Sequence, residues 1–533
     1  MSGFDFATWR SSANDPVMRS TILGLVLLDS SPNWDRLLDR FDRAARTATL
    51  LRTKVVDPGG LFQNPRLIID PDFDLSFHVR RYMMPEGATW SDVLEEARRQ
   101  SLTDFNMDRP LWQATLLEGL PGGKAAAIMK LHHAVADGQG AMILSAALFD
   151  FQDGEVDLGP LPPEPEGADL DRIGFAEAMV RDNFGWVAKT APEFVKGIAP
   201  ATLKALTNPI DTINKVRTTT GSLAKTLNIP LGPLSPLMTE RSTSYHFSTI
   251  DFPFEHLRNA AKAEGTTAND AFLAAVGEGM AIYHEKFDSP LSQLRINMPV
   301  SLRVEGDGLS NAVTIARFEM PIHIGDPDEL MHSVDDIVRK IRREPGLKMV
   351  DQIGEVSRLV PQELLSAAAQ ASDVTASNVA GSPVPMWFAG SKVLRMYPLV
   401  GTVGAAVNIT MLTYNGNASV GISTDDAAVE DLRVLMQSLR QGFSNVLGIT
   451  VHNEDPIARS GSAVVARATR PKAPAKKAPT KKAQKASAKK ATKKAPAKKK
   501  PAVKKVTKKA PAKKKVSAKK TPAKKATSRA RKK

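Results

Sequence analysis

The amino-acid sequence predicts a mixed α/β (α+β) fold in two lobes, followed by a basic tail. Strand-like and helix-like segments alternate through residues 1–150 instead of separating into blocks, and the alternation resumes near residue 241. The two halves are similar in size and in their mix of elements, which favours a ligand cleft between two lobes. A chain of 533 residues also exceeds the about 250–300 residues at which a single core stops growing.

Changes in composition divide the chain into four regions. They are the first lobe at residues 1–151, a connector with amphipathic helices at 152–240, the second lobe at 241–458 and the tail at 459–533. Closely spaced prolines in LGPLPPEPEG predict an exposed start of the connector. The candidate connector helices, near residues 175–187 and 194–206, either cover a core or form an interfacial segment for an apolar ligand.

The spacing of apolar residues predicts the elements of the first lobe. Residues 31–47 repeat apolar side chains at intervals of three and four, the spacing of one buried helix face. Residues 73–84 alternate apolar and polar side chains, which predicts a strand. A second helix is expected near 91–102 with Ser91 as its N-cap. Further strands are expected at residues 21–28, 112–117 and 125–131.

The second lobe resumes the α/β pattern at residues 242–257. A run rich in Val, Ile and Thr at residues 401–414 ends at Asn415 and Gly416, which predicts a strand followed by a tight turn. The other expected elements are strands at residues 295–303 and 315–325 and helices at 269–283, 330–341, 364–371 and 429–446.

Several functional classes are excluded or made less favourable by composition. The chain has no cysteine, which excludes disulfides, thiolate nucleophiles and Cys-ligated metals and favours a reducing compartment. The first residues do not resemble a signal peptide. No apolar run approaches the roughly 20 residues that span a bilayer. We therefore expect a cytoplasmic protein that meets membranes only at their surface.

The net charge of +15 averages two regions of opposite character. Residues 461–533 hold 30 of the 72 Lys and Arg residues and none of the 57 Asp and Glu residues, so residues 1–460 carry a net charge of −15. A segment of this composition lacks the apolar side chains needed to form a core and is expected to be disordered in isolation. Its partner is DNA or RNA, an anionic lipid surface, or solvent alone.

The stretch at residues 124–150 carries the strongest chemical pattern. An apolar run at residues 125–131 ends in His132 and His133, continues through Asp137 and Gly138, and becomes apolar again, which predicts strand, polar turn and helix. A neutral imidazole can accept a proton from an attacking hydroxyl group. A carboxylate in the turn can orient that imidazole or brace the loop.

Three other interpretations of this stretch were weighed. Adjacent histidines on a strand point to opposite sides, so His132 and His133 are poorly placed to bind one metal ion. Two core histidines at a strand end remain the structural alternative. No G-x-S-x-G elbow, Walker A motif or G-x-G-x-x-G motif occurs in the chain. A hydroxyl group of the substrate is therefore the expected nucleophile.

The string HHAVADG at residues 132–138 resembles the HHxxxDG motif of CoA-dependent acyltransferases. The chain is further similar to the bacterial wax ester synthase/diacylglycerol acyltransferase family over nearly all of residues 4–450. The supporting strings are FDLSFHVR at 73–80, DRPLW at 108–112, AND at 268–270, MPVSLR at 298–303, SNVAGS at 377–382, and a segment with Gly404, Asn408, Tyr414 and Gly416.

The resemblance implies two chloramphenicol-acetyltransferase-like lobes around a central tunnel. It implies an O-acyltransferase that moves a long-chain acyl group from acyl-CoA to diacylglycerol or to a long-chain alcohol, with no metal and no cofactor besides the acyl-CoA substrate. By the same resemblance, His133 is the general base and Asp137 holds the loop. The motif-supporting residues are His132, which is packed, Gly138, and Asn269 and Asp270 in the second lobe.

Two departures from the family pattern concern the second lobe. Ser310, Asn311 and Ala312 replace a common Gly-Asn-Arg string, and residues 377–382 differ at Ala380 and Ser382. These positions bear on acceptor choice and rate. The tail resembles those of linker histones, which suggests an alternative function: a protein that tethers lipid droplets to the nucleoid, with a weak or inactive acyltransferase fold. Peripheral binding to the inner membrane face or to lipid droplets is expected in either case.

Overall fold

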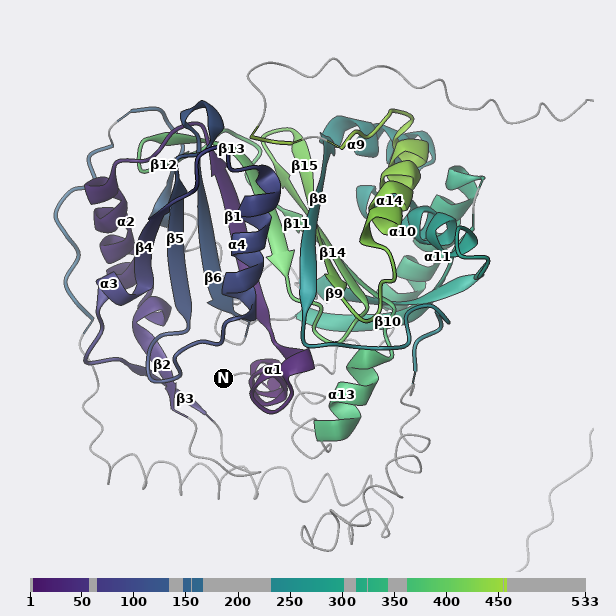
Figure 1. The fold of residues 1–533 in the computed structure, drawn as a ribbon, viewed down its shortest axis with the longest axis horizontal. Coiled ribbons are helices and arrows are strands. Elements are labelled where there is room, and N and C mark those ends of the chain that lie inside the picture. Colours follow the sequence, from purple (N-terminus) through teal and green to yellow (C-terminus); the bar gives the residue numbers. More distant parts are fainter. Residues whose placement is uncertain are drawn as a thin grey trace, which may run out of the picture. The chain divides into compact units, whose positions relative to one another are not determined.

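The computed structural model confirms a mixed α/β fold with two lobes (Figure 1). The chain forms two compact units, residues 1–471 and 472–533, and the description below concerns the first. The structure describes residues 3–56, 65–133, 147–154, 156–165, 232–301, 313–323, 325–343, 362–453 and 455–457. The expected connector helices and the tail lie outside these residues. Of the helix expected at residues 141–149, only the last three residues are described, and Phe149 already belongs to strand β7.

The first lobe is built on a seven-stranded sheet in the order β4-β5-β6-β1-β13-β12-β7. Its elements from the first part of the chain are α1 (Gly3–Asn14), β1 (Thr21–Leu28), α2 (Trp34–Thr47), β2 (Thr53–Val56), β3 (Arg66–Ile69), α3 (Leu75–His78), β4 (Val79–Met83), α4 (Trp90–Leu102), β5 (Trp112–Glu118), β6 (Ala125–His132) and β7 (Phe149–Asp150), with 3-10 turns η1 (Pro16–Met18), η2 (Thr49–Arg52) and η3 (Pro121–Gly123). The strands expected at 21–28, 112–117 and 125–131 are confirmed.

Helices α2 and α4 cover opposite faces of this sheet (Figure 1). Along β6, Ala125 and Ala127 join the α2-side core, whereas Ala126 and Ile128 join the α4-side core. Because both faces are buried, the strand is apolar at nearly every position, which explains why its sequence shows a continuous run instead of an alternation.

The second lobe is built on a six-stranded sheet in the order β10-β9-β11-β14-β15-β8. Its helices α9, α10, α11 and α14 bury the largest apolar core in the described residues against this sheet. This part of the chain forms β8 (Tyr245–Pro253), α9 (Phe254–Ala263), α10 (Ala268–Glu285), β9 (Gln293–Ser301), β10 (Val313–Pro321), α11 (Pro327–Arg343), α13 (Gln362–Gln370), β11 (Val374–Ala380), β12 (Trp387–Phe388), β13 (Ser391–Val400), β14 (Val407–Tyr414), β15 (Asn417–Asp425) and α14 (Leu432–Leu447). Of these elements, β12 and β13 belong to the first sheet.

Two strands from the second half of the sequence belong to the first sheet. Strand β13 pairs antiparallel with β1, and β12 pairs with both β13 and β7. Strand β13 also lies against β15, where a Cβ at Gly421 would collide with the Pro398 carbonyl oxygen. A glycine is therefore required at this crossing of the two sheets. No local pattern in the sequence indicates that β12 and β13 join the first sheet.

A shared core joins the two lobes. Trp90 and Val93 of α4 pack with Tyr245 and Phe247 of β8 in one apolar cluster. Trp90 Nε1 donates to Thr249 Oγ1 at 2.9 Å, and the hydroxyls of Ser101 and Tyr245 lie 2.6 Å apart. Burial of these side chains resists separation of the lobes at this contact.

The expected strand over residues 73–84 is wrong in its first half. Residues 75–78 form the short helix α3, and the strand begins only at Val79. Asp74 caps this helix, since its Oδ1 accepts from Ser76 N at 2.9 Å and from Ser76 Oγ at 2.7 Å. These hydrogen bonds also hold the pKa of the Asp74 carboxyl below its ordinary value. A local side-chain contact thus overrides the period-two pattern.

Two expected element boundaries are also corrected. Helix α4 begins at Trp90, and Thr89 replaces Ser91 as its N-cap, because Thr89 and Asp92 form a capping box. In the second lobe, the strand expected from Gly401 starts at Val407. None of the helices among the described residues is long and apolar enough to cross a membrane.

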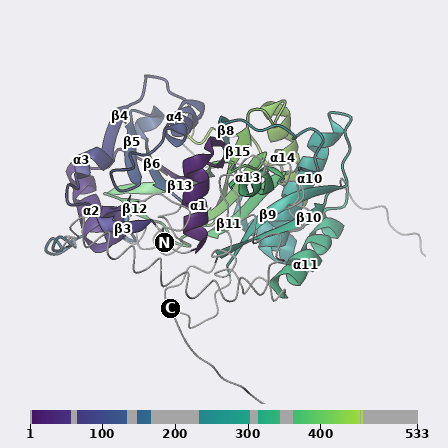
Figure 2. The same ribbon diagram turned by 90° about the horizontal axis from the view of Figure 1, so that it is seen from below.

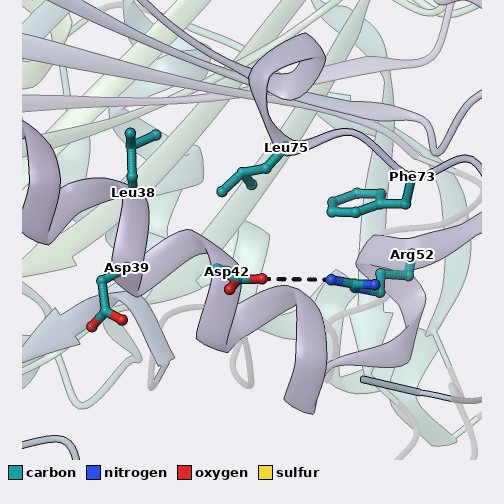
Figure 3. Close-up of a pocket in the computed structure, with 6 residues that line it drawn as sticks. All are labelled: Leu38, Asp39, Asp42, Arg52, Phe73 and Leu75. Atoms are coloured by element: carbon teal, nitrogen blue, oxygen red, sulfur yellow. Dashed lines mark hydrogen bonds and ion pairs between the residues drawn. The ribbon is translucent and has the colours of Figure 1, made fainter. Parts of the chain in front are cut away.

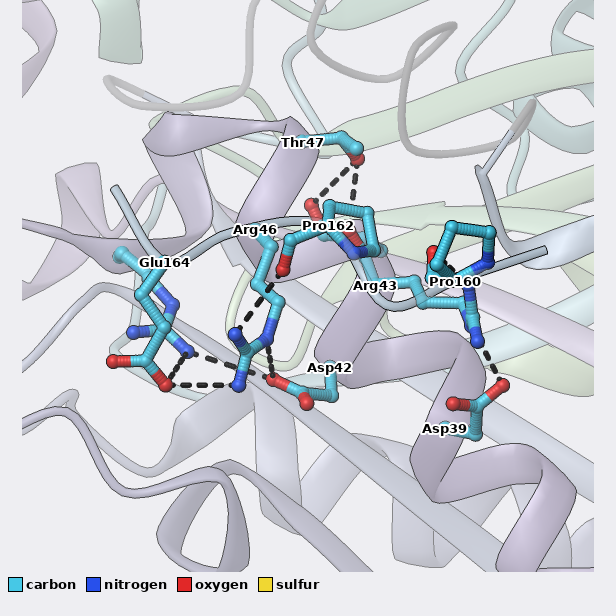
Figure 4. A network of polar contacts seen from close by, with 10 residues as sticks. Asp39, Asp42, Arg43, Arg46, Thr47, Pro160, Pro162 and Glu164 are labelled. Carbon is cyan, nitrogen blue, oxygen red and sulfur yellow. Dashed lines mark hydrogen bonds and ion pairs between the residues drawn. The ribbon is translucent and has the colours of Figure 1, made fainter. Parts of the chain in front are cut away.

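The proline-rich start of the connector is held on α2 (Figure 4). Arg43 Nη1 donates to the carbonyl oxygens of Leu158 and Pro160, both at 3.1 Å. Arg46 donates to Pro162 O at 3.1 Å and to the Glu164 carboxylate at 2.8 Å. Pro160 and Pro163 are exposed, as expected, whereas Pro162 and Pro165 are half-buried. The carbonyl groups of Pro160 and Pro162 anchor the segment to the first lobe.

Candidate active site

The two histidines lie at the end of β6, where the backbone is fixed on both sides. His132 N donates to Leu111 O at 3.1 Å, and His132 pairs with Thr21 across the ladder of β6 and β1. The next amide, His133 N, donates to Ser20 O at 2.8 Å. The strand end is therefore held by the chain before β5 on one side and by the chain before β1 on the other.

His132 is packed into the protein. It is 4% exposed, and its Nε2 lies 2.9 Å from Ser12 Oγ of α1. The rings of Trp9 and Phe105 contact it at centroid distances of 5.5 and 5.9 Å. Burial, with smaller contributions from His133 and Lys130, lowers the pKa of His132 to about 4. His132 is consequently neutral near pH 7, and its environment suits a packing role better than proton transfer.

His133 differs from its neighbour in exposure. Its side chain is half-buried, and it directly follows β6, which ends at His132. A half-buried imidazole on a fixed strand end can meet a substrate and still be oriented by the fold. Asp137, Gly138 and Gly140 lie outside the described residues.

Lys130 is a buried cation that sequence reasoning missed. It is 1% exposed and lies on the same face of β6 as His132. Its Nζ donates to Thr103 O at 2.6 Å and lies 4.2 Å from the centroid of the Phe105 ring. Burial lowers the pKa of Lys130 to about 8. The only sequence signal was a lysine inside an apolar run.

The chain returns from the motif segment at β7, where Asp150 is anchored to α2. Asp150 is 5% exposed and forms ion pairs with Arg40 and, at 3.3 Å, with Arg36. The described chain is therefore held before residue 134 by the hydrogen bonds of His132 and His133 and after residue 146 by this carboxylate. The sequence did not predict the ion pairs of Arg36 and Arg40, because arginines on a helix usually indicate a solvent-exposed surface.

Asn269 and Asp270 lie in the first turn of α10. Thr267 caps this helix, and Asp270 Oδ2 accepts from Thr267 N at 2.9 Å and from Thr267 Oγ1 at 2.6 Å. Asp270 is 1% exposed, whereas Asn269 is half-buried and its Nδ2 lies 3.7 Å from Met298 Sδ. The structure thus places Asp270 in a capping box, and the amide of Asn269 makes only a weak polar contact here.

Asn408 links the second lobe to the strand end that carries the histidines. Gly401 N donates to Thr21 O at 3.2 Å, and Asn408 Nδ2 donates to Gly401 O at 3.1 Å. Thr410 Oγ1 then donates to Asn408 Oδ1 at 2.9 Å. Asn408 is 3% exposed, so its position in the family-like segment is explained by a buried hydrogen-bond chain between the lobes.

The altered string at residues 377–382 lies at the end of β11. Strand β11 pairs with β14 along its whole length but with β9 only at Val374 and Thr375. Beyond that point Asn378, Val379 and Ala380 are exposed. Residues 310–312 lie outside the described residues.

Two surface hollows lie away from the histidines. The larger, of about 360 Å³, is lined by Leu38, Asp39, Asp42, Arg52, Phe73 and Leu75 (Figure 3). Arg52 contacts the Asp42 carboxylate at 3.5 Å and covers the Phe73 ring. The smaller, of about 280 Å³, lies beside Ser30, Arg36 and Ser391. In the described part of the chain, no group of three or more His, Asp or Glu side chains could hold a metal ion.

Comparisons with known proteins agree on one family. The model of the wax ester synthase/diacylglycerol acyltransferase catalytic domain matches residues 1–272, and that of the WS/DGAT C-terminal domain matches residues 309–447. A Mycobacterium tuberculosis protein with the provisional name of diacylglycerol O-acyltransferase is 33% identical over 451 residues, which cover 84% of this chain and 91% of that protein. The O-acyltransferase WSD of Acinetobacter baylyi is 26% identical over 399 residues, 72% of this chain and 84% of its own.

Solved structures show the same fold at lower identity. The wax ester synthase/diacylglycerol acyltransferase from Marinobacter aquaeolei aligns with a TM-score of 0.56 at 19% identity and covers 84% of this chain and 98% of its own. The starter condensation domain of rhizomide synthetase aligns with a TM-score of 0.51 at 14% identity, covering 87% and 96%. The two-lobed architecture is thereby confirmed, whereas the tunnel between the lobes stays a prediction.

Proposed function

The chain belongs to the wax ester synthase/diacylglycerol acyltransferase family, and from this membership we propose that it transfers a long-chain acyl group from acyl-CoA to diacylglycerol. Long-chain alcohols are the second acceptor class, which would give wax esters. This proposal rests on the match to both family domains, together with the half-buried position of His133 at the end of β6.

In the proposed reaction His133 is the general base. Its imidazole accepts the proton of the acceptor hydroxyl while the hydroxyl oxygen attacks the thioester carbonyl carbon. The tetrahedral intermediate then collapses, the C–S bond breaks, and the imidazolium returns the proton to the CoA thiolate. No covalent bond to the enzyme forms in this scheme. The His132 ring is buried and enclosed by Trp9, Phe105 and Ser12, which supports the choice of the half-buried His133.

The remaining motif residues have supporting roles in this proposal. Asp137 and Gly138 shape the loop after His133, and Asn269 is a weaker candidate donor to the developing oxyanion. The capping box of Asp270 supports a role in building the start of α10. Acyl-CoA is a substrate here, and the scheme needs no metal ion.

The expected partners follow from the acceptor class and the tail. Diacylglycerol resides in lipid, so the enzyme would work at the inner membrane face or on lipid droplets. The 30 positive charges of residues 461–533 would bind DNA, RNA or anionic lipid by counterion release. Deletion of this tail should abolish DNA retardation at low salt and leave acyl transfer; unchanged retardation would refute a nucleic-acid role. The family assignment does not favour an inactive tethering protein.

The decisive experiment measures acyl transfer from labelled palmitoyl-CoA to diacylglycerol by the full chain. Replacement of the base, His133→Ala, should lower kcat by about 10²- to 10⁴-fold. The matched control is His246→Ala, since His246 is an exposed histidine of β8 that pairs with Asp426, and it should retain the rate. Equal transfer by intact protein and His133→Ala would contradict the proposal.

A further inference from the structure

The segment before β1 encloses the strand end that carries the histidines. Trp9 and Ser12 of α1 contact the His132 ring, and Ser20 accepts the hydrogen bond from His133 N. Helix α1 also contacts α13 of the second lobe, and Figure 2 shows it at the junction of the two lobes. The first helix of the chain is thus part of the surroundings of the motif.

We propose that Ser12 is a positioning residue for acyl transfer, which acts on His133 through His132. The inference rests on the proposed role of His133 as general base. His132 is the last residue of β6, and His133 follows it directly, so the two residues share a peptide bond and a displacement of the His132 backbone also displaces His133. By holding the His132 ring, Ser12 limits that displacement together with the backbone hydrogen bonds of both residues.

The hydrogen-bond geometry defines what Ser12 does. Its hydroxyl donates to Trp9 O at 3.1 Å, so its oxygen accepts a hydrogen bond from His132 Nε2–H at 2.9 Å. A neutral histidine carries one ring proton, and this contact favours the tautomer that has the proton on Nε2. Ser12 therefore selects both the orientation and the tautomer of His132, across 120 positions of sequence.

Helix α1 does not depend on this contact for its own position. Trp9 is buried with Val55 and Leu111 in a separate apolar cluster. Asp15 N donates to Ser11 O at 3.0 Å, and the Asp15 side chain caps the turn η1. Removal of the Ser12 hydroxyl should consequently leave the helix in place, which separates a positioning effect from a loss of folding.

The test compares three variants of the full chain in the palmitoyl-CoA assay. Ser12→Ala removes the hydroxyl, and Ser12→Thr keeps it. Asn14→Ala is the matched control, because it removes the hydrogen bond from Asn14 Nδ2 to Arg10 O on the same helix without changing a contact of His132. We expect Ser12→Ala to lower kcat by about tenfold, the effect of one hydrogen bond, with KM for acyl-CoA changed less than about twofold. Ser12→Thr and Asn14→Ala should stay within about twofold of the intact enzyme.

A spectroscopic measurement gives an independent readout. With ¹⁵N-labelled histidine, the resonances of His132 should show a single tautomer protonated at Nε2 in the intact protein and a mixture of tautomers in Ser12→Ala. An unchanged kcat in Ser12→Ala, or an equal fall in Ser12→Thr, would overturn the inference while leaving the base assignment standing. A rate retained by His133→Ala would instead refute the base, and with it the positioning role.

Discussion

The end of β6 and the start of α10 both carry two consecutive polar residues of the family-like motifs. In each pair one side chain is buried and hydrogen-bonded, His132 at 4% and Asp270 at 1% exposure, and the other, His133 or Asn269, is half-buried. The anchors differ in origin, since Ser12 lies 120 positions from His132 whereas Thr267 lies three positions from Asp270. The comparison teaches that each pair joins a buried structural residue to a half-buried residue, for which we propose a chemical role.

The largest expected effect concerns the buried residue of the first pair, His132, and is a change in the free energy of unfolding with pH. Its folded pKa of about 4 lies below the ordinary value of 6.5, so the unfolded chain binds one more proton between these pH values. The contribution of His132 to the free energy of unfolding therefore falls as pH drops from about 6.5 to 4, by about 3 kcal/mol in total. Urea unfolding across this range should show a smaller loss in His132→Gln. Equal pH dependence of both proteins would show that His132 is not buried in its neutral form.

A smaller effect tests the corresponding pair on α10. Asn269→Ala should lower kcat by about tenfold, the effect of one hydrogen bond to the developing oxyanion, with little change in the free energy of unfolding. The matched control Thr267→Ala removes the helix cap, so it should lower the free energy of unfolding by about 1 kcal/mol and leave kcat per folded molecule intact. If both variants changed only the free energy of unfolding, the start of α10 would contribute no residue to acyl transfer. It would then differ from the end of β6 in function.

Much of the local structure around these pairs could be predicted from the sequence. The spacing of Leu37 and Phe41 gave α2 its buried face, and the apolar run before His132 gave β6. In the second lobe, the expected helix at 269–283 corresponds to α10 within a few residues.

The features that escaped prediction depend on partners distant in sequence or on single side chains. The pairing of β13 with β1 joins residues more than 350 positions apart, and no local pattern encodes it. The buried Lys130 and the ion pair of Asp150 with Arg40 require a tertiary partner to become visible. Helix α3 was missed because one carboxylate, Asp74, outweighed an alternating pattern. Sequence patterns report burial, whereas these contacts depend on which segments meet.

The insertion of β13 beside β1 also bears on how the protein is made. Strand β1 spans Thr21–Leu28, but its neighbour on one side is Ser391–Val400. At a synthesis rate of about 5–20 residues per second, some tens of seconds pass before the ribosome supplies that neighbour. During this time one edge of an almost wholly apolar strand has no native partner, and such edges are templates for aggregation. The first lobe would therefore complete its fold late, after most of the second lobe has emerged.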